Sequence, residues 1–192
     1  MALTYSTPER DPVRRAMGSF AAGVTVITTR DESGAPLGMT ATAFTAVSFD
    51  PASVLVCLSL SARTHRLIRD AGQYGVNLLG ADSQSVSDYC AKPGQDKVLP
   101  SSWLDSSDRW NSPCLRAAHA FFDCDVRETV ETGTHVIVIG QVRAVGISPL
   151  RDATGPLLHY RGSYRRLAPL LPGTTPDPLP IVFQDSLLME AH

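Results

Sequence analysis

The stretch from Gly38 to Thr64 reads GMTATAFTAVSFDPASVLVCLSLSART. It predicts two apolar strands joined by a turn at Asp50–Pro51, followed by a helix that begins at Ser61. The first strand is crowded with small and hydroxyl side chains, although larger branched side chains would remove more apolar area from water. Small side chains allow a flat ligand to lie close to the backbone, where free N–H and C=O groups can reach it.

The second predicted strand ends in hydroxyl residues, Ser59, Ser61 and Thr64, where the helix is expected to begin. The first amides of a helix have no intrahelical partner, so a helix N-terminus attracts anions. A flat wall beside such a helix end indicates a nucleotide-cofactor site. The residues alone leave ordinary alternatives open, because a small-residue strand can simply pack against a helix and Ser or Thr can simply cap one.

Composition limits the class of protein. The chain has 192 residues, 43% of them hydrophobic and 19% charged, which is typical of one soluble globular domain. The formal net charge is −2 and Lys and Arg form no run, so we expect neither nucleic-acid nor membrane binding. The four cysteines form no C-x-x-C pair and have no histidine at metal-ligand spacing, so we expect no metal site.

The expected location is the cytoplasm. The cysteine pattern suits a reducing compartment, and Glu9, Arg10 and Asp11 stand where a signal peptide would need an apolar core. No stretch approaches the roughly 18 apolar residues of a membrane span.

Long strand-like runs dominate the rest of the chain. We expect a helix from Pro8 that ends at Gly23, strands over 24–29, 74–79, 114–130, 135–145 and 157–167, short helices ending near Gly72 and over 82–91, and an irregular excursion over 92–113. Long antiparallel strands joined by hairpin turns favour a barrel or a sandwich over a doubly wound parallel sheet. The domain is expected over 1–167, and 168–192 is expected to be a Pro-rich extended C-terminal tail.

The sequence contains neither G-x-G-x-x-G nor G-x-x-x-x-G-K-[ST]. A nicotinamide enzyme with this sequence would therefore hold its dinucleotide in some other way than a Rossmann domain does.

Five segments together resemble the short-chain flavin reductases, the small components of two-component flavin-dependent monooxygenases. They are GMTATAFTAVS (38–48), LVCLSLSARTH (55–65), YGVNLL (74–79), GTHVIVIGQV (133–142) and PLLHYRGSYRRL (156–167). The resemblance covers most of residues 13–167 in the order and spacing of the family.

The resemblance implies a mainly β fold with peripheral helices, a split β-barrel of the FMN-binding type, paired as a homodimer. It implies an NAD(P)H:flavin oxidoreductase that transfers a hydride from NADH or NADPH to FMN or FAD. The reduced flavin would then reach a partner monooxygenase by diffusion. The choices between FMN and FAD and between NADH and NADPH stay open.

The resemblance also assigns site residues. Cofactor contacts are implied for Thr40, Ala41, Thr42, Ala43, Cys57, Leu58, Ser59, Ser61, Thr64, Lys97, Tyr160 and Arg161, and a catalytic position beside the nicotinamide for His135. The sequence departs from the family at Leu60, where Lys or Arg is common, and Arg63 or Lys97 is the alternative source of that charge. It also departs at Thr134, which replaces the Asp of a Gly-Asp-His motif.

Two other functions are compatible with this architecture. One is a non-enzymatic flavin- or haem-binding split barrel that acts as a carrier or sensor and does not oxidise NADH. The other is an oxidase like pyridoxamine-phosphate oxidase. Against the second, the sequence shows no basic cluster suited to another phosphate-bearing substrate.

Overall fold

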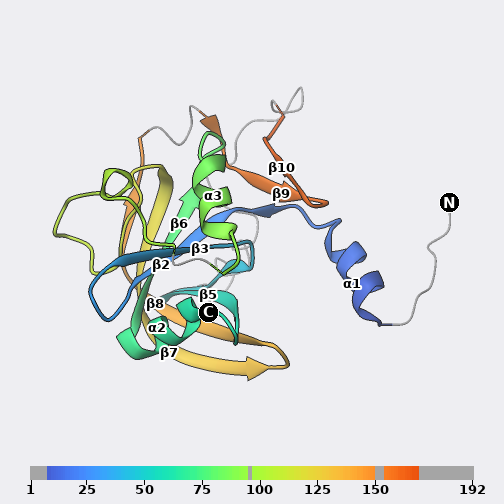
Figure 1. Cartoon of the computed structure of the whole chain (residues 1–192), viewed down its shortest axis with the longest axis horizontal. Coiled ribbons are helices and arrows are strands. Elements are labelled where there is room, and N and C mark those ends of the chain that lie inside the picture. Colours follow the sequence, from blue (N-terminus) through green and yellow to red (C-terminus); the bar gives the residue numbers. More distant parts are fainter. Residues whose placement is uncertain (1–7, 95–96, 150–153, 169–192) are drawn as a thin grey trace, which may run out of the picture.

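The computed structural model describes residues 8–94, 97–149 and 154–168 (Figure 1). The elements are α1 Arg10–Met17, β1 Ala22–Gly23, β2 Thr25–Arg30, β3 Pro36–Ala41, β4 Phe44–Phe49, β5 Ala52–Ser59, α2 Arg63–Ala71, β6 Gln73–Leu79, α3 Gln84–Ala91, a 3-10 turn Ser101–Trp103, β7 Ala118–Thr132, β8 His135–Ile147, β9 Leu158–Tyr160 and β10 Ser163–Arg165. The expected mainly β fold with peripheral helices is confirmed. The expectations for the first seven residues and for the tail beyond 168 lie outside the described residues.

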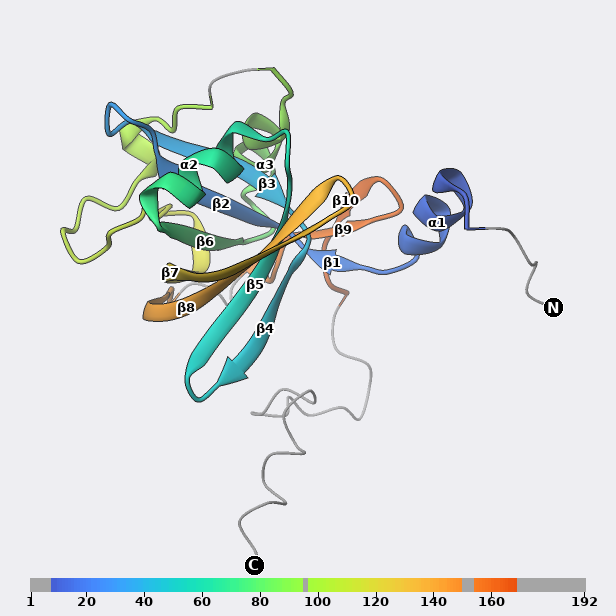
Figure 2. The same cartoon turned by 90° about the horizontal axis from the view of Figure 1, so that it is seen from below.

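The main sheet has seven strands in the order β3-β2-β6-β7-β8-β5-β4, and every neighbouring pair is antiparallel. Strands β3 and β4 lie at opposite edges, yet only Thr42 and Ala43 separate them along the chain. The sheet must therefore curl until its two edges meet at these residues, as Figure 2 shows. Because β3 and β4 do not pair, the result is a barrel with a split, as expected.

Glycine residues determine where the β7–β8 hairpin reverses and where α2 ends. Strands β7 and β8 are joined by Gly133 and Thr134 alone, and Gly133 has a φ of 56°, which the two-residue hairpin requires. Helix α2 ends at Gly72, whose φ of 68° closes the helix in the left-handed conformation. A second, three-stranded sheet pairs β1 with β9 and β9 with β10, so it joins the two ends of the described chain.

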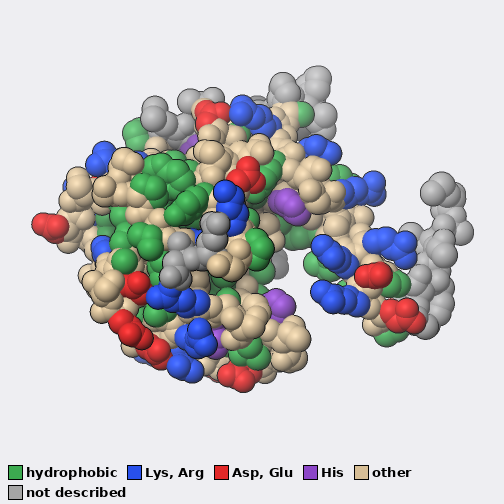
Figure 3. Space-filling view, in the orientation of Figure 1, with side chains coloured by type: hydrophobic (Ala, Val, Ile, Leu, Met, Phe, Trp, Pro, Cys, Tyr) green, Lys and Arg blue, Asp and Glu red, His purple; other side chains and the backbone are tan. Residues whose placement is uncertain are grey.

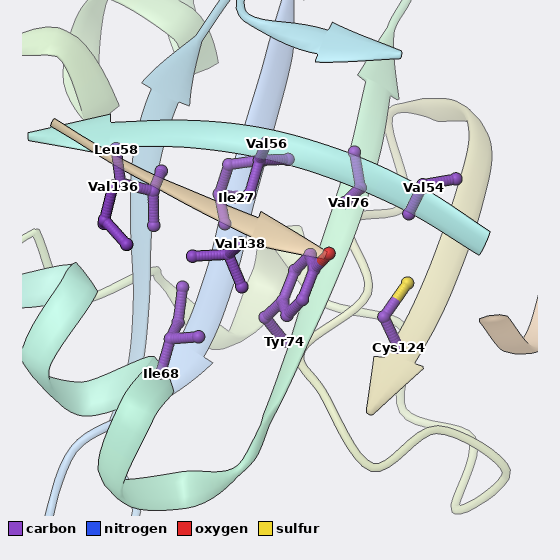
Figure 4. Close-up of a cluster of buried hydrophobic side chains, with 10 residues drawn as sticks. All are labelled: Ile27, Val54, Val56, Leu58, Ile68, Tyr74, Val76, Cys124, Val136 and Val138. Atoms are coloured by element: carbon purple, nitrogen blue, oxygen red, sulfur yellow. The ribbon is translucent and has the colours of Figure 1, made fainter. Parts of the chain in front are cut away.

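Two hydrophobic clusters stabilise these layers. One fills the barrel interior and is drawn in Figure 4: Ile27, Val54, Val56, Leu58, Ile68, Tyr74, Val76, Cys124, Val136 and Val138. The Tyr74 ring lies against Gly140, where any Cβ would overlap it, so glycine is needed at that position. The other cluster, which includes Leu79, Cys90 and Leu99, packs beneath α3.

A fully buried amide joins the barrel to the long loop. Asn77 donates from Nδ2 to the Val26 carbonyl and to the Thr28 hydroxyl, both at 3.1 Å, and its Oδ1 accepts from the Leu115 N–H at 2.7 Å. The Thr28 hydroxyl in turn donates to the Pro113 carbonyl at 2.6 Å. The segment that leads into β7 is thus attached to β2 and β6 by a completely satisfied polar group.

Four expectations about local structure were wrong. The strand expected from Gly38 to the turn at Asp50–Pro51 is broken at Thr42 and Ala43 into β3 and β4, because the curled sheet places its two parts on opposite edges. Helix α1 ends at Gly18, not at Gly23, because Ala22 and Gly23 must be extended to pair with β9. The strand expected over 157–167 is a hairpin, since Arg161 and Gly162 adopt positive φ values of 48° and 76° and reverse the chain. Helix α2 begins two residues later than expected, at Arg63.

Among the described residues, no helix is long and apolar enough to cross a membrane.

Candidate cofactor site

Two clefts lie along β3 and its continuation. The first, which we name the anion cleft, has a volume of about 330 Å³ and is lined by Gly38 and Met39 of β3, by Ser61 to Thr64 and by Lys97. The second, which we name the α1 cleft, has a volume of about 780 Å³ and lies between α1, the β9–β10 turn and the pair Thr42–Ala43. The chain thus passes from one cleft to the other along a single strand.

The N-terminus of α2 faces the anion cleft without a side-chain cap. Ala62 holds the N-cap position and has no oxygen to offer, and no side chain accepts a cap hydrogen bond there. The hydroxyls of Ser59 and Ser61 instead interact with each other at 2.9 Å. The ordinary capping role that the sequence left open is therefore excluded for α2, and its first amides are available to an anion.

Both alternative sources of positive charge lie at the anion cleft. The Lys97 carbonyl accepts from the Gly38 N–H at 3.2 Å, which holds the long loop against β3. Lys97 forms no ion pair with any carboxylate of the described residues, whereas Arg63 lies 3.5 Å from a carboxylate oxygen of Asp31. Lys97 is therefore the less neutralised of the two cations.

The Asp31 carboxylate that faces Arg63 is held ionised. Hydrogen bonds from the Ser33 hydroxyl and from the N–H groups of Ala35 and Ser33, together with the Arg63 charge, lower the pKa of Asp31, against the opposing effect of burial. This carboxylate thus stays negative at neutral pH and offsets part of the Arg63 charge.

The small residues from Gly38 to Ala43 have two different surroundings. A Cβ at Gly38 would lie 2.9 Å from the Cys90 sulfur, and the Thr40 hydroxyl donates to the Ser87 carbonyl at 2.7 Å, so both positions are small because α3 packs on them. Thr42 and Ala43 instead line the α1 cleft. Only backbone groups of Thr40 and Ala41 are available to a ligand, because the outer edge of β3 is hydrogen-bonded to residues 97–99 as far as Gly38 and β3 pairs with no named strand other than β2 in the described part.

Strand β5 brings the next group of candidate residues to the split. Leu58 is 1% exposed and its side chain belongs to the barrel core, so only its backbone is available. The neighbouring Cys57 is half-buried, and its N–H donates to the Ala43 carbonyl at 3.0 Å, which continues the pairing of β4 with β5. Ser59 pairs with His135 at the end of the β5–β8 ladder.

The His135 imidazole has a defined neighbour. Its Nδ1 lies 2.8 Å from the hydroxyl of Thr134, the residue that replaces the Asp of the family motif, and this contact can orient the ring. The residue is exposed at the tip of the β7–β8 hairpin, next to Ser59 on the adjoining strand. It lines neither of the two clefts.

The β9–β10 hairpin places Arg161 in the wall of the α1 cleft, with its guanidinium 5.3 Å from the Tyr160 ring centroid. Two further arginines, Arg14 and Arg15 of α1, also line this cleft, and they are not among the site residues predicted from the sequence. Their position depends on the pairing of the two-residue strand β1 with β9, and so short a strand has no detectable pattern.

Residues 17–168 match the model of the flavin reductase like domain. The chain belongs to this family. In the family's solved members the same architecture is found: the NADH:FAD oxidoreductase SgcE6 of Streptomyces globisporus C-1027, solved in complex with NAD and FAD fragments, superposes with a TM-score of 0.76 at 29% identity and covers 88% of this chain and 98% of its own.

Curated relatives show the same affiliation. The flavin reductase (NADPH) of Lentzea aerocolonigenes is 40% identical over 147 residues, which are 76% of this chain and 83% of that protein. The reductase component of a flavin-dependent trigonelline monooxygenase from Acinetobacter baylyi is 35% identical over 155 residues, or 79% of this chain. The chain spans about half the length of the Acinetobacter protein, with 47% of it covered.

Proposed function

We propose that this protein is an NAD(P)H-dependent flavin reductase that transfers a hydride from nicotinamide to FMN or FAD. The observation that supports this most directly is the order of the two clefts along β3. The anion cleft offers a cationic, uncapped helix end, and the open edge of β3 leads from there to Thr42 in the α1 cleft. Relatives named as flavin reductases support the same reaction.

The residues present fit a flavin. Gly38 and Thr42 are four residue steps apart, and at about 3.3 Å per step they span about 13 Å, a distance that suits a phosphate, a ribityl chain and part of a ring system. The uncapped amides of α2, with Thr64 and Lys97, would hold the phosphate. Backbone groups of Thr40 and Ala41 would meet the ring edge, and Thr42 and Ala43 would border its far end.

A bound flavin supplies the hydride-accepting ring, and the chain supplies position and orientation. The α1 cleft adjoins the proposed ring position and is the space through which nicotinamide would approach. We assign His135, with its ring oriented by Thr134, to the border of the nicotinamide. Arg161 lines the α1 cleft, and we assign to the same site Tyr160, whose ring lies beside the Arg161 guanidinium. No proton-transfer chain is required, because water can protonate the reduced product.

We further propose a homodimer that delivers reduced flavin by diffusion to a partner monooxygenase. Exposed apolar side chains on β4 and β8 support self-association: Phe49 and Ile147 are each 61% exposed. The Acinetobacter relative is named as the reductase component of a flavin-dependent monooxygenase, which supports a monooxygenase partner. All four cysteines are free thiols, which supports a reducing cytoplasmic location.

The test is oxidation of NADH and of NADPH by the purified chain, followed by loss of nicotinamide absorbance with FMN, FAD or no flavin added. Turnover that depends on added flavin is expected, and flavin binding without any turnover would refute the reductase and favour a carrier.

The proposed position of the ring has its own test. Thr42→Trp should fill the space assigned to the far end of the flavin ring and abolish flavin binding. Ser106→Trp, in an exposed loop outside both clefts, should leave flavin binding unchanged. Retained flavin binding in a folded Thr42→Trp variant would show that the ring lies elsewhere.

A further inference from the structure

The α1 cleft has more positive charge than a flavin phosphate at the anion cleft can use. Arg14 and Arg15 of α1 and Arg161 of the β9–β10 turn all line it. None of these guanidinium groups forms an ion pair with a carboxylate of the described residues. The sequence showed no basic cluster because the fold brings the three together from opposite ends of the chain. Unneutralised cations around a cleft indicate an anionic ligand.

The walls of this cleft are fixed to each other. Helix α1 stands clear of the barrel, as Figures 2 and 3 show, and contributes no buried residue. At its C-terminal end the Arg161 N–H donates to the Gly18 carbonyl at 3.1 Å, and β1 then pairs with β9. Arg161 also has a φ of 48°, which is uncommon for a residue other than glycine. The opening between α1 and the turn is therefore a defined feature of the fold.

The chemistry of the walls suits one end of a nucleotide. Arginine has a planar fork of donors that matches the oxygens of a phosphate group. Met17 and Phe20, which are 62% and 69% exposed, add apolar surface on the α1 side against which a planar base can lie. Together the cleft offers places for a phosphate and for a base.

The position of the cleft decides which nucleotide this is. The anion cleft lies about 13 Å away along β3 and is assigned to the flavin phosphate. In FAD the second phosphate is attached directly to the first, so the adenylate would continue from the anion cleft and away from the ring. The α1 cleft lies at the other end, next to Thr42 and Ala43. Its ligand is therefore the second substrate.

We propose that Arg14, Arg15 and Arg161 bind phosphate groups of the nicotinamide dinucleotide. This inference rests on the proposed reductase function. Two sources of phosphate share this chemistry: the pyrophosphate that NADH and NADPH both contain, and the 2′-phosphate that only NADPH contains.

The experiment compares Arg14→Ala and Arg15→Ala with Arg10→Ala, which removes the same charge from the same helix but does not line the cleft. The Kd values of NADH and NADPH are measured by nicotinamide fluorescence without flavin, and the KM values by turnover. Each cleft variant should raise the dinucleotide Kd and KM about fivefold, since these arginines are exposed. The Kd of FMN should not change, and Arg10→Ala should stay within about twofold in every measurement.

The possible results distinguish the two sources of phosphate, and they distinguish this inference from the proposed reductase function. Equal losses for NADH and NADPH assign the arginines to the pyrophosphate, and a loss for NADPH alone assigns them to the 2′-phosphate. Unchanged Kd values in both cleft variants, or a loss for FAD alone, overturn the inference even if the unchanged chain is an active reductase. Dinucleotide binding that depends on Arg14 and Arg15 without any turnover upholds the inference and refutes the reductase. If the unchanged chain binds no dinucleotide, both are refuted.

Discussion

Asn77 should be among the most sensitive positions in the protein, and its replacement by Ala tests our account of how the long loop is attached. The side chain is fully buried and makes three hydrogen bonds, to Val26, Thr28 and Leu115. Each such bond contributes about 1 kcal/mol net. Asn77→Ala also leaves the Leu115 N–H buried without an acceptor, which adds about 1–3 kcal/mol. The expected loss is therefore about 4–6 kcal/mol of the free energy of unfolding.

Asn77→Asp refines the test, because it keeps the shape and the acceptor for Leu115. The carboxylate would face the Val26 carbonyl, and it could recruit the Thr28 hydroxyl only at the cost of the bond to Pro113. At neutral pH we therefore expect Asp to be at least as destabilising as Ala. Burial should raise the pKa of this carboxyl, so lowering the pH should restore part of the stability as the protonated group regains a donor.

The assay is equilibrium unfolding in urea, followed by circular dichroism, for both variants and for Gln84→Ala. Gln84 also carries an amide, but it is exposed and makes only a 3.5 Å contact with Asp88, so its loss should change stability by less than about 0.5 kcal/mol. A loss below about 1 kcal/mol for Asn77→Ala, or an Asp variant more stable than the Ala variant at neutral pH, would refute the reasoning.

Three further predictions follow from contacts described above. Lys97→Ala should weaken FMN binding about fivefold, because it removes a cation from the anion cleft. Binding of riboflavin, which has no phosphate, should not change. Equal losses of affinity for both ligands in a fluorescence titration would contradict the anion-cleft assignment. Gly38→Ala should cost about 1–3 kcal/mol by overpacking, and adding Cys90→Ala should recover part of that cost in urea unfolding, whereas strict additivity would argue against the contact. Burial raises the pKa values of Cys90, Cys114 and Cys124 from 9.0 to about 12. As pH rises, the unfolded chain therefore loses these protons before the folded chain does, and the free energy of unfolding should fall between about pH 9 and pH 12. A free energy of unfolding that does not change over this range in urea titrations would contradict this.

Much of the barrel could be predicted from local patterns. The turn at Asp50–Pro51 lies where the sequence places it, because turn residues and flanking β-branched runs act locally. The connection expected over 131–134 is also present, although β7 continues to Thr132 and leaves only Gly133 and Thr134 in the loop. The helix end at Gly72 is confirmed for the same reason. The family assignment, which rested on the order of five segments, is confirmed by the comparisons.

The break within the first stretch could not be predicted. The sequence from Gly38 to Ser48 shows small residues throughout, yet the chain leaves β3 after Ala41 and enters β4 at Phe44, on the opposite edge of the sheet. That break exists because the whole sheet curls, and no local pattern carries this information. Gly38 is small because Cys90 of α3 packs against it, whereas Thr42 lines the α1 cleft. The same run of small residues thus meets a packing requirement at one end and borders a cleft at the other.

Single residues of both clefts could not be placed from the sequence either. The sequence left open an ordinary capping role for Ser59 and Ser61, but Ala62 takes the N-cap position. Arg14 and Arg15 were missed altogether, since only the pairing of β1 with β9 brings them to Arg161. Residues whose neighbours come from distant segments are the ones that sequence patterns could not place.

The pairing of β1 with β9 also orders the events of biosynthesis. All seven strands of the main sheet are complete by Ile147, so the barrel can begin to form before β9 and β10 have been synthesised. The wall of the α1 cleft that contains His159 and Arg161 emerges only afterwards, and β1 has no partner strand until then. The barrel strands therefore precede in the chain the residues that close this cleft, so during synthesis the cleft can be completed only after β9 and the β9–β10 turn have followed them.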